Sequence, residues 1–132
     1  MPRGSAGASP SRGATPDFRF RKHEHLRRPE EFQRVYDRRR SASDEWLIVY
    51  ACENDLGHLR VGFSVSKKVV GDAVDRNRMR RLYREAFRLT RHEIQTGLDL
   101  VLIPKRAEEP PLEALKGSLV KLVRQVAKRM TT

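Results

Sequence analysis

The chain has 132 residues and a formal net charge of +11, with 28 lysines and arginines against 17 acidic residues. This length allows one small domain with a modest core, and the charge favours nucleic acid or another polyanion as a partner. The longest purely apolar run, Trp46–Cys52, is too short to span a membrane. Residues 1–17 lack the apolar segment of a secretory signal, and a single cysteine excludes an internal disulfide. We therefore expect a cytoplasmic protein with no membrane partner.

Residues 1–17 are rich in glycine, alanine, serine, proline and arginine. A segment of this composition buries too little apolar surface to offset the entropy lost on ordering the chain. We therefore predict a disordered, weakly basic tail over residues 1–17 and one folded domain over residues 18–130. Whether the arginines of the tail contact RNA or belong to an inert extension stays open at this stage.

The first part of the domain predicts a short helix followed by a hairpin. A proline and two glutamates open a predicted helix over residues 29–38. The run Trp46–Cys52 is β-branched and aromatic, which is typical of a buried strand. Apolar and polar residues alternate over Leu59–Ser66, and the turn residues between the two runs favour their pairing as a hairpin. A short extra strand near residues 41–43 is compatible with this order.

The densest basic segment is Ser64–Arg91, which holds nine lysines and arginines and three acids. Gly71 and Asp72 begin a helix that should run to about Gln95 and stop at Gly97, with Asp72 as its N-cap. At about 100° per residue, one arc of this helix is apolar and another carries arginines. The apolar arc holds Met79, Leu82, Tyr83, Ala86 and Leu89 with Phe87 at its edge, and the basic arc holds Arg76, Arg80, Arg84, Arg88 and Arg91. Guanidinium groups bind phosphates and stack on bases, so this helix predicts a contact with RNA or DNA.

The remaining sequence predicts a strand over Leu98–Ile103 and a last helix that Pro110 and Pro111 introduce. Its apolar residues recur on one stripe: Leu112, Leu115, Leu119, Leu122, Val123 and Val126. The chain therefore runs helix, strand, strand, helix, strand, helix, with no internal repeat. This order predicts an α+β fold, namely a small two-layer α-β sandwich with helices over one sheet.

Aromatic side chains on the first helix and the first strand offer a second candidate surface. If the two elements pack together, these side chains line an apolar groove with arginines at its rim. The candidates are Phe32, Tyr36, Trp46, Ile48 and Tyr50, with Arg27 and Arg28 at the rim. Bases of a single strand stack on such surfaces, but residues at helical and strand spacing more often form core. From the residues alone, both interpretations, a base-stacking groove and packed core, remain open.

No pattern in the chain predicts catalysis by its own side chains. His23, Glu24 and His25 lack a second pair of zinc ligands, and the sequence has no glycine-rich phosphate loop and no clustered carboxylates. We therefore expect no catalytic residue, no metal site and no firmly bound cofactor. Two RNA-binding surfaces without catalytic groups favour an accessory protein that positions RNA for chemistry done elsewhere.

The stretch LRVGFSVSKKVVGDAVDRNRMRRLYREAFR, residues 59–88, resembles the signature of the bacterial ribonuclease P protein subunit. The matching positions are Arg60, Gly62, Ser64, Lys67, Lys68, Gly71, Ala73, Val74, Arg76, Asn77, Arg78, Arg80, Arg81, Arg84, Glu85 and Phe87. Upstream, Phe32, Tyr36 and Tyr50 stand at aromatic positions of that family. The resemblance implies a small α-β sandwich with a left-handed βαβ crossover, which the general preference for right-handed crossovers would not predict.

The resemblance also implies a function and two binding surfaces. In that family the protein partners a large catalytic RNA, with one protein per RNA expected, and the RNA with its bound Mg²⁺ removes the 5′ leader of precursor tRNA. The surface for the catalytic RNA would comprise Lys67, Lys68, Arg76, Asn77, Arg78, Arg80, Arg81 and Arg84. The cleft for the single-stranded 5′ leader would comprise Arg27, Arg28, Phe32, Tyr36, Ile48 and Tyr50.

Several positions depart from the family pattern. Val70 is one extra residue in the loop before the long helix, Asp72 replaces an asparagine, and His25 stands where a basic residue is common. Arg39 and Arg40 replace a turn that commonly contains glycine. None of these changes removes a residue of the core motif, so the resemblance holds over about residues 18–129.

We therefore expect the protein subunit of an RNA-based endoribonuclease that forms the mature 5′ end of tRNA. A non-catalytic RNA-binding module of the ribosomal type shares the charge and the fold but needs no leader cleft. A basic amphipathic helix for an anionic membrane is a further alternative, against which the arginine bias and the surrounding strands count. RNA binding that does not depend on the 5′ leader would favour the RNA-binding module, and binding of the protein to liposomes would favour the membrane helix.

Overall fold

The computed structural model describes residues 24–94 and 96–130. These residues form, in chain order, α1 (Pro29–Asp37), β2 (Ser41–Ser43), β3 (Leu47–Glu53), β4 (Arg60–Phe63), α2 (Ala73–Thr90), the short 3-10 helix η2 (Arg91–Glu93), β5 (Leu98–Pro104) and α3 (Leu112–Met130). The predicted α+β class is confirmed, and the short strand near residues 41–43 is present. The predicted tail over residues 1–17 and the start of the predicted domain, residues 18–23, lie outside the described residues.

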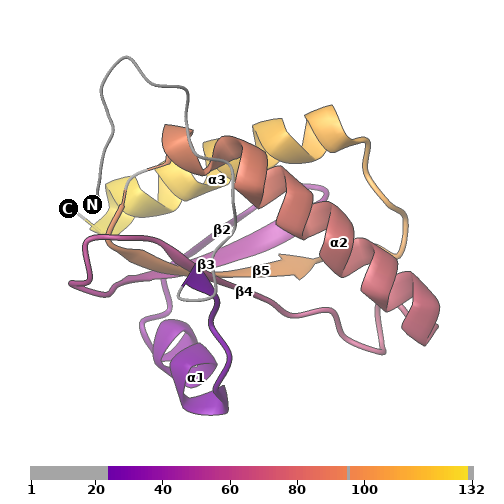
Figure 1. The fold of residues 1–132 in the computed structure, drawn as a ribbon, viewed down its shortest axis with the longest axis horizontal. Coiled ribbons are helices and arrows are strands. Elements are labelled where there is room, and N and C mark those ends of the chain that lie inside the picture. Colours follow the sequence, from indigo (N-terminus) through magenta and orange to yellow (C-terminus); the bar gives the residue numbers. More distant parts are fainter. Residues whose placement is uncertain (1–23, 95, 131–132) are drawn as a thin grey trace, which may run out of the picture.

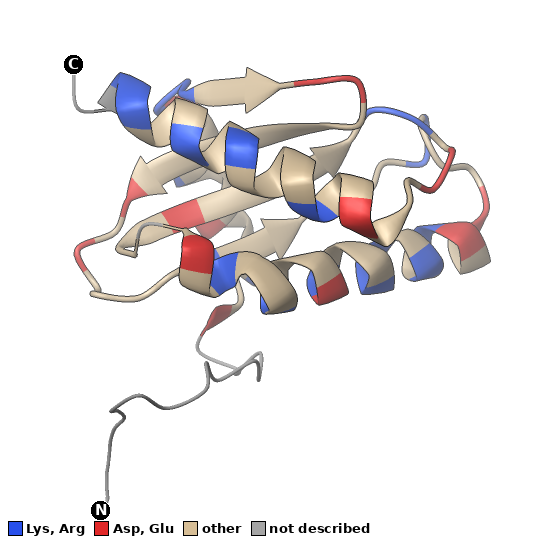
Figure 2. Cartoon of the chain, turned by 90° about the horizontal axis from the view of Figure 1, so that it is seen from above, with Lys and Arg blue, Asp and Glu red and all other residues tan. Residues whose placement is uncertain are grey.

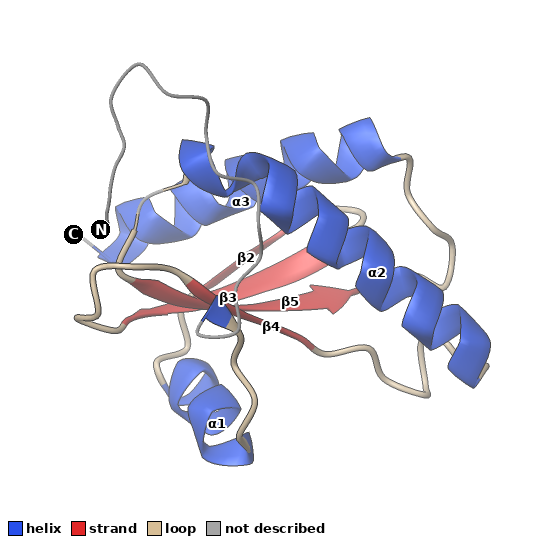
Figure 3. Cartoon of the chain, viewed as in Figure 1, coloured by secondary structure: helices blue, strands red, loops and turns tan. Residues whose placement is uncertain are grey.

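The four strands form one sheet in the order β2-β3-β5-β4, with helices on both faces (Figures 1 and 3). α2 and α3 cover one face, and α1 lies against the other. Side chains alternate along β3, so Leu47, Val49 and Ala51 join the main core under α2 and α3. Cys52 instead joins a smaller cluster that includes Val35 of α1. The predicted sandwich of helices on a sheet is thus confirmed, and α1 adds a partial layer on the opposite face.

The order of the strands corrects one prediction. β5 lies between β3 and β4, so the hairpin of Trp46–Cys52 with Leu59–Ser66 is wrong. β3 runs antiparallel to β5, while β4 runs parallel to β5 with Val61 opposite Leu100. Every residue of β5 except Ile103 is buried, and a strand covered on both faces belongs at the centre of a sheet. The chain passes from β4 to β5 through α2, which is the βαβ crossover that the resemblance implies.

α2 begins where the sequence predicts and ends earlier. The Asp72 carboxylate accepts a hydrogen bond from the Val74 backbone N–H (2.8 Å), which confirms Asp72 as the N-cap. The helix ends at Thr90, whose hydroxyl donates to the Ala86 carbonyl (2.7 Å) before the chain tightens into η2. Gly97, the predicted stop of the helix, instead adopts a φ of 80° in the turn that leads into β5.

Gly62 of β4 is a point of close approach between the sheet and α1. A Cβ atom on Gly62 would lie 2.4 Å from Cζ of Phe32 and 3.1 Å from Cβ of Leu26. Gly62→Ala should therefore displace the Phe32 ring and lower the free energy of unfolding by about 1–3 kcal/mol, measured by urea denaturation. Gly71→Ala is the control, because its nearest neighbouring atom would be 3.8 Å away. Equal losses in both variants would contradict the close approach.

Candidate nucleic-acid interface

The first candidate surface comprises α2 as far as Arg84 and the loop before the helix. Six of its predicted members, Lys67, Lys68, Asn77, Arg78, Arg81 and Arg84, are exposed, and Arg76 and Arg80 are half-buried. Among the described residues, no carboxylate lies within ion-pairing distance of Lys67, Lys68, Arg81 or Arg84. Figure 2 shows the basic segments along α2 and α3 from this side of the molecule. The predicted residues are therefore accessible on α2 and the loop before it, where their positive charge suits an anionic partner.

The loop between β4 and α2 is folded by its own contacts, which give the extra residue Val70 a structural role. Val70 is 2% exposed within the main core, and its N–H donates to the Ser66 carbonyl (2.9 Å). The Arg76 guanidinium donates to the carbonyls of Val70 (3.1 Å) and Gly71 (2.8 Å). Arg76 therefore stabilises the loop that presents the two exposed lysines, in addition to lying on the basic surface.

The row of arginines along α2 is shorter than its periodicity predicts. Arg88 donates two hydrogen bonds to the Glu85 carboxylate (3.0 and 2.7 Å). Arg91 pairs with Glu24, a buried carboxylate from the segment before α1. Because these carboxylates neutralise the last two arginines of the predicted row, the open basic surface of α2 ends at Arg84. An inventory of acids on the helix alone misses Glu24, which is distant in sequence.

The second candidate surface lies on the opposite face of the sheet, beside α1. Phe32 and Tyr36 of α1 and Tyr50 of β3 pack against one small cluster, in which the rings of Tyr36 and Tyr50 meet edge to face at 5.2 Å. Ile48 lies two residues before Tyr50 on the same face of β3, opposite Ile103 of β5. All five side chains are only partly buried. The structure thus brings the predicted residues together as one partly open apolar surface.

Two neighbouring residues differ from the prediction for this surface. Trp46 does not share the face of Tyr50: it packs against the main core, and the Arg106 guanidinium lies 4.8 Å from the ring centroid. β3 begins only at Leu47, so the alternation of the strand does not extend back to Trp46. Ile103 belongs to the apolar surface, but sequence reasoning misses it because only the strand register places it beside Ile48.

The rim of the apolar surface is basic at the start of α1. Arg27 and Arg28 are exposed, and their backbone N–H groups donate to one carboxylate oxygen of Glu31 (2.9 and 3.0 Å), which fixes the entry into the helix. Half-buried His25 precedes them, and its burial, with the positive charges of Arg27 and Arg84, lowers its pKa. His25 is therefore mostly neutral at pH 7 and adds little charge between the two surfaces.

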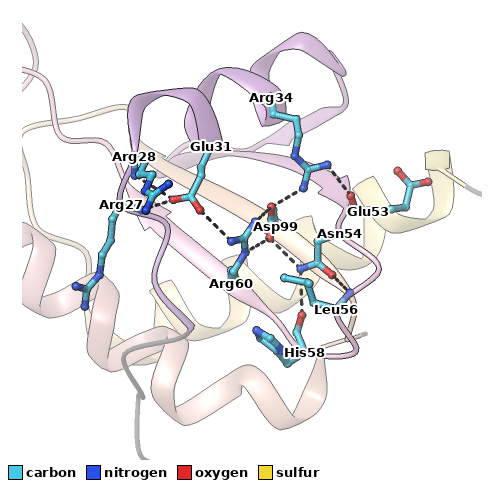
Figure 4. Close-up of polar contacts among 10 residues, drawn as sticks. All are labelled: Arg27, Arg28, Glu31, Arg34, Glu53, Asn54, Leu56, His58, Arg60 and Asp99. Carbon is cyan, nitrogen blue, oxygen red and sulfur yellow. Dashed lines mark hydrogen bonds and ion pairs between the residues drawn. The ribbon is translucent and has the colours of Figure 1, made fainter.

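A buried carboxylate, Asp99 of β5, organises the space between α1 and the sheet (Figure 4). Arg60 of β4 donates two hydrogen bonds to Asp99 (2.8 and 2.7 Å), and Arg34 of α1 and Asn54 donate one each (2.7 and 2.8 Å). Arg60 also pairs with Glu31 of α1 (2.9 Å). Burial alone would raise the pKa of Asp99, but the hydrogen bonds from Arg60 and Asn54 outweigh it and the pKa is lowered. This network connects α1 to β4 and β5, so it fixes the helix that carries the aromatic rings.

Sequence reasoning misses this network, although one signal for it is present. Asp99 is the single charged residue in an otherwise apolar strand, and a buried carboxylate requires a partner. Its main partner, Arg60, is identified only by the parallel register that sets the two residues opposite each other.

The rest of the described chain adds no further reactive centre to these surfaces. Across residues 24–94 and 96–130, no group of three or more His, Cys, Asp and Glu side chains is placed to hold a metal ion. None of the helices in that part of the chain is both long and apolar enough to cross a membrane. Cys52 is buried, and burial raises the pKa of its thiol, which is therefore protonated at neutral pH.

Comparison with known proteins relates the chain to one family over most of its length. Residues 20–127 match the family model for Ribonuclease P. The ribonuclease P protein component of Thermoanaerobacter sp. (strain X514) is 41% identical over 99 residues, which cover 74% of this chain and 84% of that protein. The corresponding protein of Clostridioides difficile (strain 630) is 36% identical over 111 residues, covering 83% and 94%.

Solved structures show the same fold. The RNase P protein of Staphylococcus aureus superposes with a TM-score of 0.67 at 33% identity, covering 80% of this chain and 95% of that one. The RNase P protein of Thermotoga maritima gives a TM-score of 0.70 at 29% identity, covering 77% and 96%.

The α+β sandwich and its basic helix define a small RNA-binding protein. The match to the family model and the similarity to these relatives identify the family: the chain belongs to the ribonuclease P protein family. It is thereby a component of an endoribonuclease complex with an RNA partner and a role in processing the 5′ end of tRNA. The family resemblance drawn from residues 59–88 is confirmed.

Asp99→Asn should destabilise the protein, because it removes the negative charge that holds Arg60 and Arg34. We expect a loss of about 2–4 kcal/mol in the free energy of unfolding at pH 7, measured by urea denaturation. Folding lowers the pKa of Asp99 from its ordinary value of 3.8, so its contribution is present above about pH 4 and is lost as the pH falls through the folded-state pKa. The difference in free energy of unfolding between the wild type and Asp99→Asn should therefore become smaller at acidic pH.

The matched control for this prediction is Asp55→Asn, which removes the same charge at an exposed position. It should change the free energy of unfolding by no more than about 0.5 kcal/mol. A loss in Asp99→Asn that is equally large at pH 7 and at pH 3 would show that the effect does not come from the carboxylate charge.

Proposed function

We propose that this chain binds the catalytic RNA of ribonuclease P through α2 and holds the 5′ leader of precursor tRNA beside α1. The observation that carries the proposal is the presence of two surfaces of different chemistry on opposite faces of one sheet. One is rich in arginine and the other is aromatic, which suits a folded polyanion and a single strand respectively.

The α2 surface would bind phosphates of the catalytic RNA. Its proposed members are Lys67, Lys68, Arg76, Asn77, Arg78, Arg80, Arg81 and Arg84. Planar guanidinium groups bind phosphate oxygens through two donors at once, whereas the flexible lysines act as point charges. Exposed ion pairs of this kind release counterions on binding, so affinity for the RNA should fall steeply with salt.

The surface beside α1 would hold the leader. Its proposed members are Arg27, Arg28, Phe32, Tyr36, Ile48 and Tyr50. Bases of an unpaired strand stack on partly exposed aromatic rings, at about 1–3 kcal/mol per base, without needing a defined sequence. Mature tRNA lacks the leader, so these contacts would favour the substrate over the product of the reaction.

The chemical step would belong to the RNA partner. We assign the Mg²⁺ ions to the RNA, as the family resemblance implies, and route no step through a metal held by the protein. The protein would act by positioning, with one copy per RNA, and it would work in the cytoplasm, where we expect its substrate.

Reconstitution tests this function. The purified chain is mixed with a bacterial ribonuclease P RNA and a precursor tRNA that carries a leader, at low Mg²⁺ concentration. We expect cleavage at the mature 5′ end that requires both the RNA and the protein. Tight RNA binding without stimulated cleavage would instead favour an RNA-binding module, and cleavage by the protein alone would overturn the assignment of the chemistry to the RNA.

The two surfaces should be separable by mutation. Arg80→Ala should weaken binding of the catalytic RNA and reduce the slope of log affinity against log salt by about 0.7–0.9, because one phosphate contact is lost. Tyr36→Ala should weaken binding of leader-bearing precursor tRNA to the assembled complex by roughly 5- to 150-fold, but leave binding of leaderless tRNA unchanged. Tyr36→Phe retains the ring and serves as the control. Loss of the same function in both alanine variants would contradict two separate surfaces.

A further inference from the structure

The third helix carries a basic row that neither proposed surface uses. From residue 114 to residue 132 the sequence has five lysines and arginines and no acidic residue. Lys121, Arg124 and Lys128 follow Gly117 at spacings of i+4, i+7 and i+11, so the four positions share one face of α3. All four residues are exposed, and Figure 2 shows the succession of basic segments along this helix.

Gly117 has no packing role that would account for a glycine inside a helix. It is exposed, and a Cβ atom at this position would meet no atom within 4 Å. Glycine is the least favourable residue in a helix interior after proline, because it has the most backbone freedom to lose. It is useful where another backbone must approach the helix closely. In a row of lysines and arginines, the backbone that fits by charge is the sugar–phosphate backbone of a nucleic acid.

A groove of about 580 Å³ lies beside this row, between α3 and the end of α2. The α3 side is lined by Glu113, Lys116, Gly117, Val120, Lys121 and Arg124, and the other side by Thr90 and Glu93. Lys116 lies 3.2 Å from the Glu113 carboxylate and neutralises it. Within the protein, Lys121 is 3.4 Å from the Asp44 carboxylate, and Arg124 donates to the Glu93 backbone carbonyl at 3.4 Å. The Lys121 and Arg124 side chains are exposed, so a phosphate can compete for both of them. The Asp44 carboxylate is only 13% exposed, but it also accepts hydrogen bonds from the backbone N–H groups of Trp46 and Leu47, so it keeps partners when Lys121 turns to a phosphate.

We propose that this face of α3, with Gly117 at its N-terminal end, is a second docking surface for the backbone of the catalytic RNA. The proposal rests on the proposed function, in which the same RNA binds α2. α2 and α3 cover the same face of the sheet, whereas the leader surface lies on the opposite face (Figure 1). Ten residues of helix separate Arg80 from Thr90, or about 15 Å. A folded RNA large enough to be catalytic spans that distance and reaches α3.

The double variant Lys121→Gln/Arg124→Gln, made in the full chain, tests whether the positive charge of the α3 row contributes to RNA binding. The probe is a purified bacterial ribonuclease P RNA without tRNA, titrated at several salt concentrations. We expect about tenfold weaker binding and a salt slope smaller by about 1.4–1.8, which corresponds to two lost phosphate contacts. Arg38→Gln/Arg39→Gln is the matched control: it removes the same charge from exposed residues at the end of α1 and should leave both values unchanged.

The glycine gives an independent test that separates binding from folding. Gly117→Gln adds a good helix former in open space, so it should raise Tm by roughly 3–6 °C. The same side chain should block the approach of the RNA backbone and weaken binding several-fold without any change of charge. A variant that is more stable and binds less RNA supports the proposal. A variant that is more stable and binds as tightly as wild type overturns it.

The outcomes distinguish this proposal from the proposed function. If Arg80→Ala weakens binding of the catalytic RNA while the α3 double variant matches its control, the α3 surface is refuted and the proposed function stands. If the α3 double variant binds the catalytic RNA normally but weakens capture of precursor tRNA by the complex, the occupant is tRNA and the proposal is overturned. If neither variant affects RNA binding, both fail.

Discussion

The structure depends on one buried carboxylate in its central strand. Asp99 is fully buried, and a charge in that position is tolerated only because Arg60 and Arg34 neutralise it and Asn54 completes its hydrogen bonds. Arg60 reaches it from the neighbouring parallel strand and Arg34 from α1. A nine-residue helix is marginal on its own, so this network and the small cluster beneath α1 hold it on the sheet. The position of the aromatic rings follows from that attachment.

The sheet separates two surfaces of different chemistry, a basic one on α2 and an aromatic one beside α1. Its α2 face keeps a large apolar core and turns the cations of α2 outward. Arg78 lies 3.6 Å from both Asp75 and Glu109, but exposed pairs at that distance contribute little. A phosphate can therefore displace them, whereas the buried network around Asp99 persists. On the other face the short helix α1 leaves Tyr36 and Tyr50 partly open, so apolar surface stays available without weakening the main core.

Three residues that depart from the family pattern lie in loops or at a helix start, where the structure accommodates them. Val70 lengthens the loop before α2, yet its side chain enters the core and its carbonyl accepts from Arg76. Asp72 serves as the helix cap and keeps its charge at the positive end of the helix dipole. Arg39 adopts a φ of 55° in the turn after α1, a conformation that glycine would adopt more easily, at a cost of roughly 1–2 kcal/mol.

The sequence by itself determined the local features: the start of α2 at Asp72, the apolar and basic arcs of that helix, and the aromatic positions Phe32, Tyr36 and Tyr50. Caps and periodicity act over a few residues, so a linear pattern records them. Only the tertiary structure decided that β5 lies between β3 and β4, which residues face Asp99, and that Glu24 neutralises Arg91. These features join residues far apart in the chain. They arise from strand order and register, which depend on burying all apolar faces at once and not on any local segment.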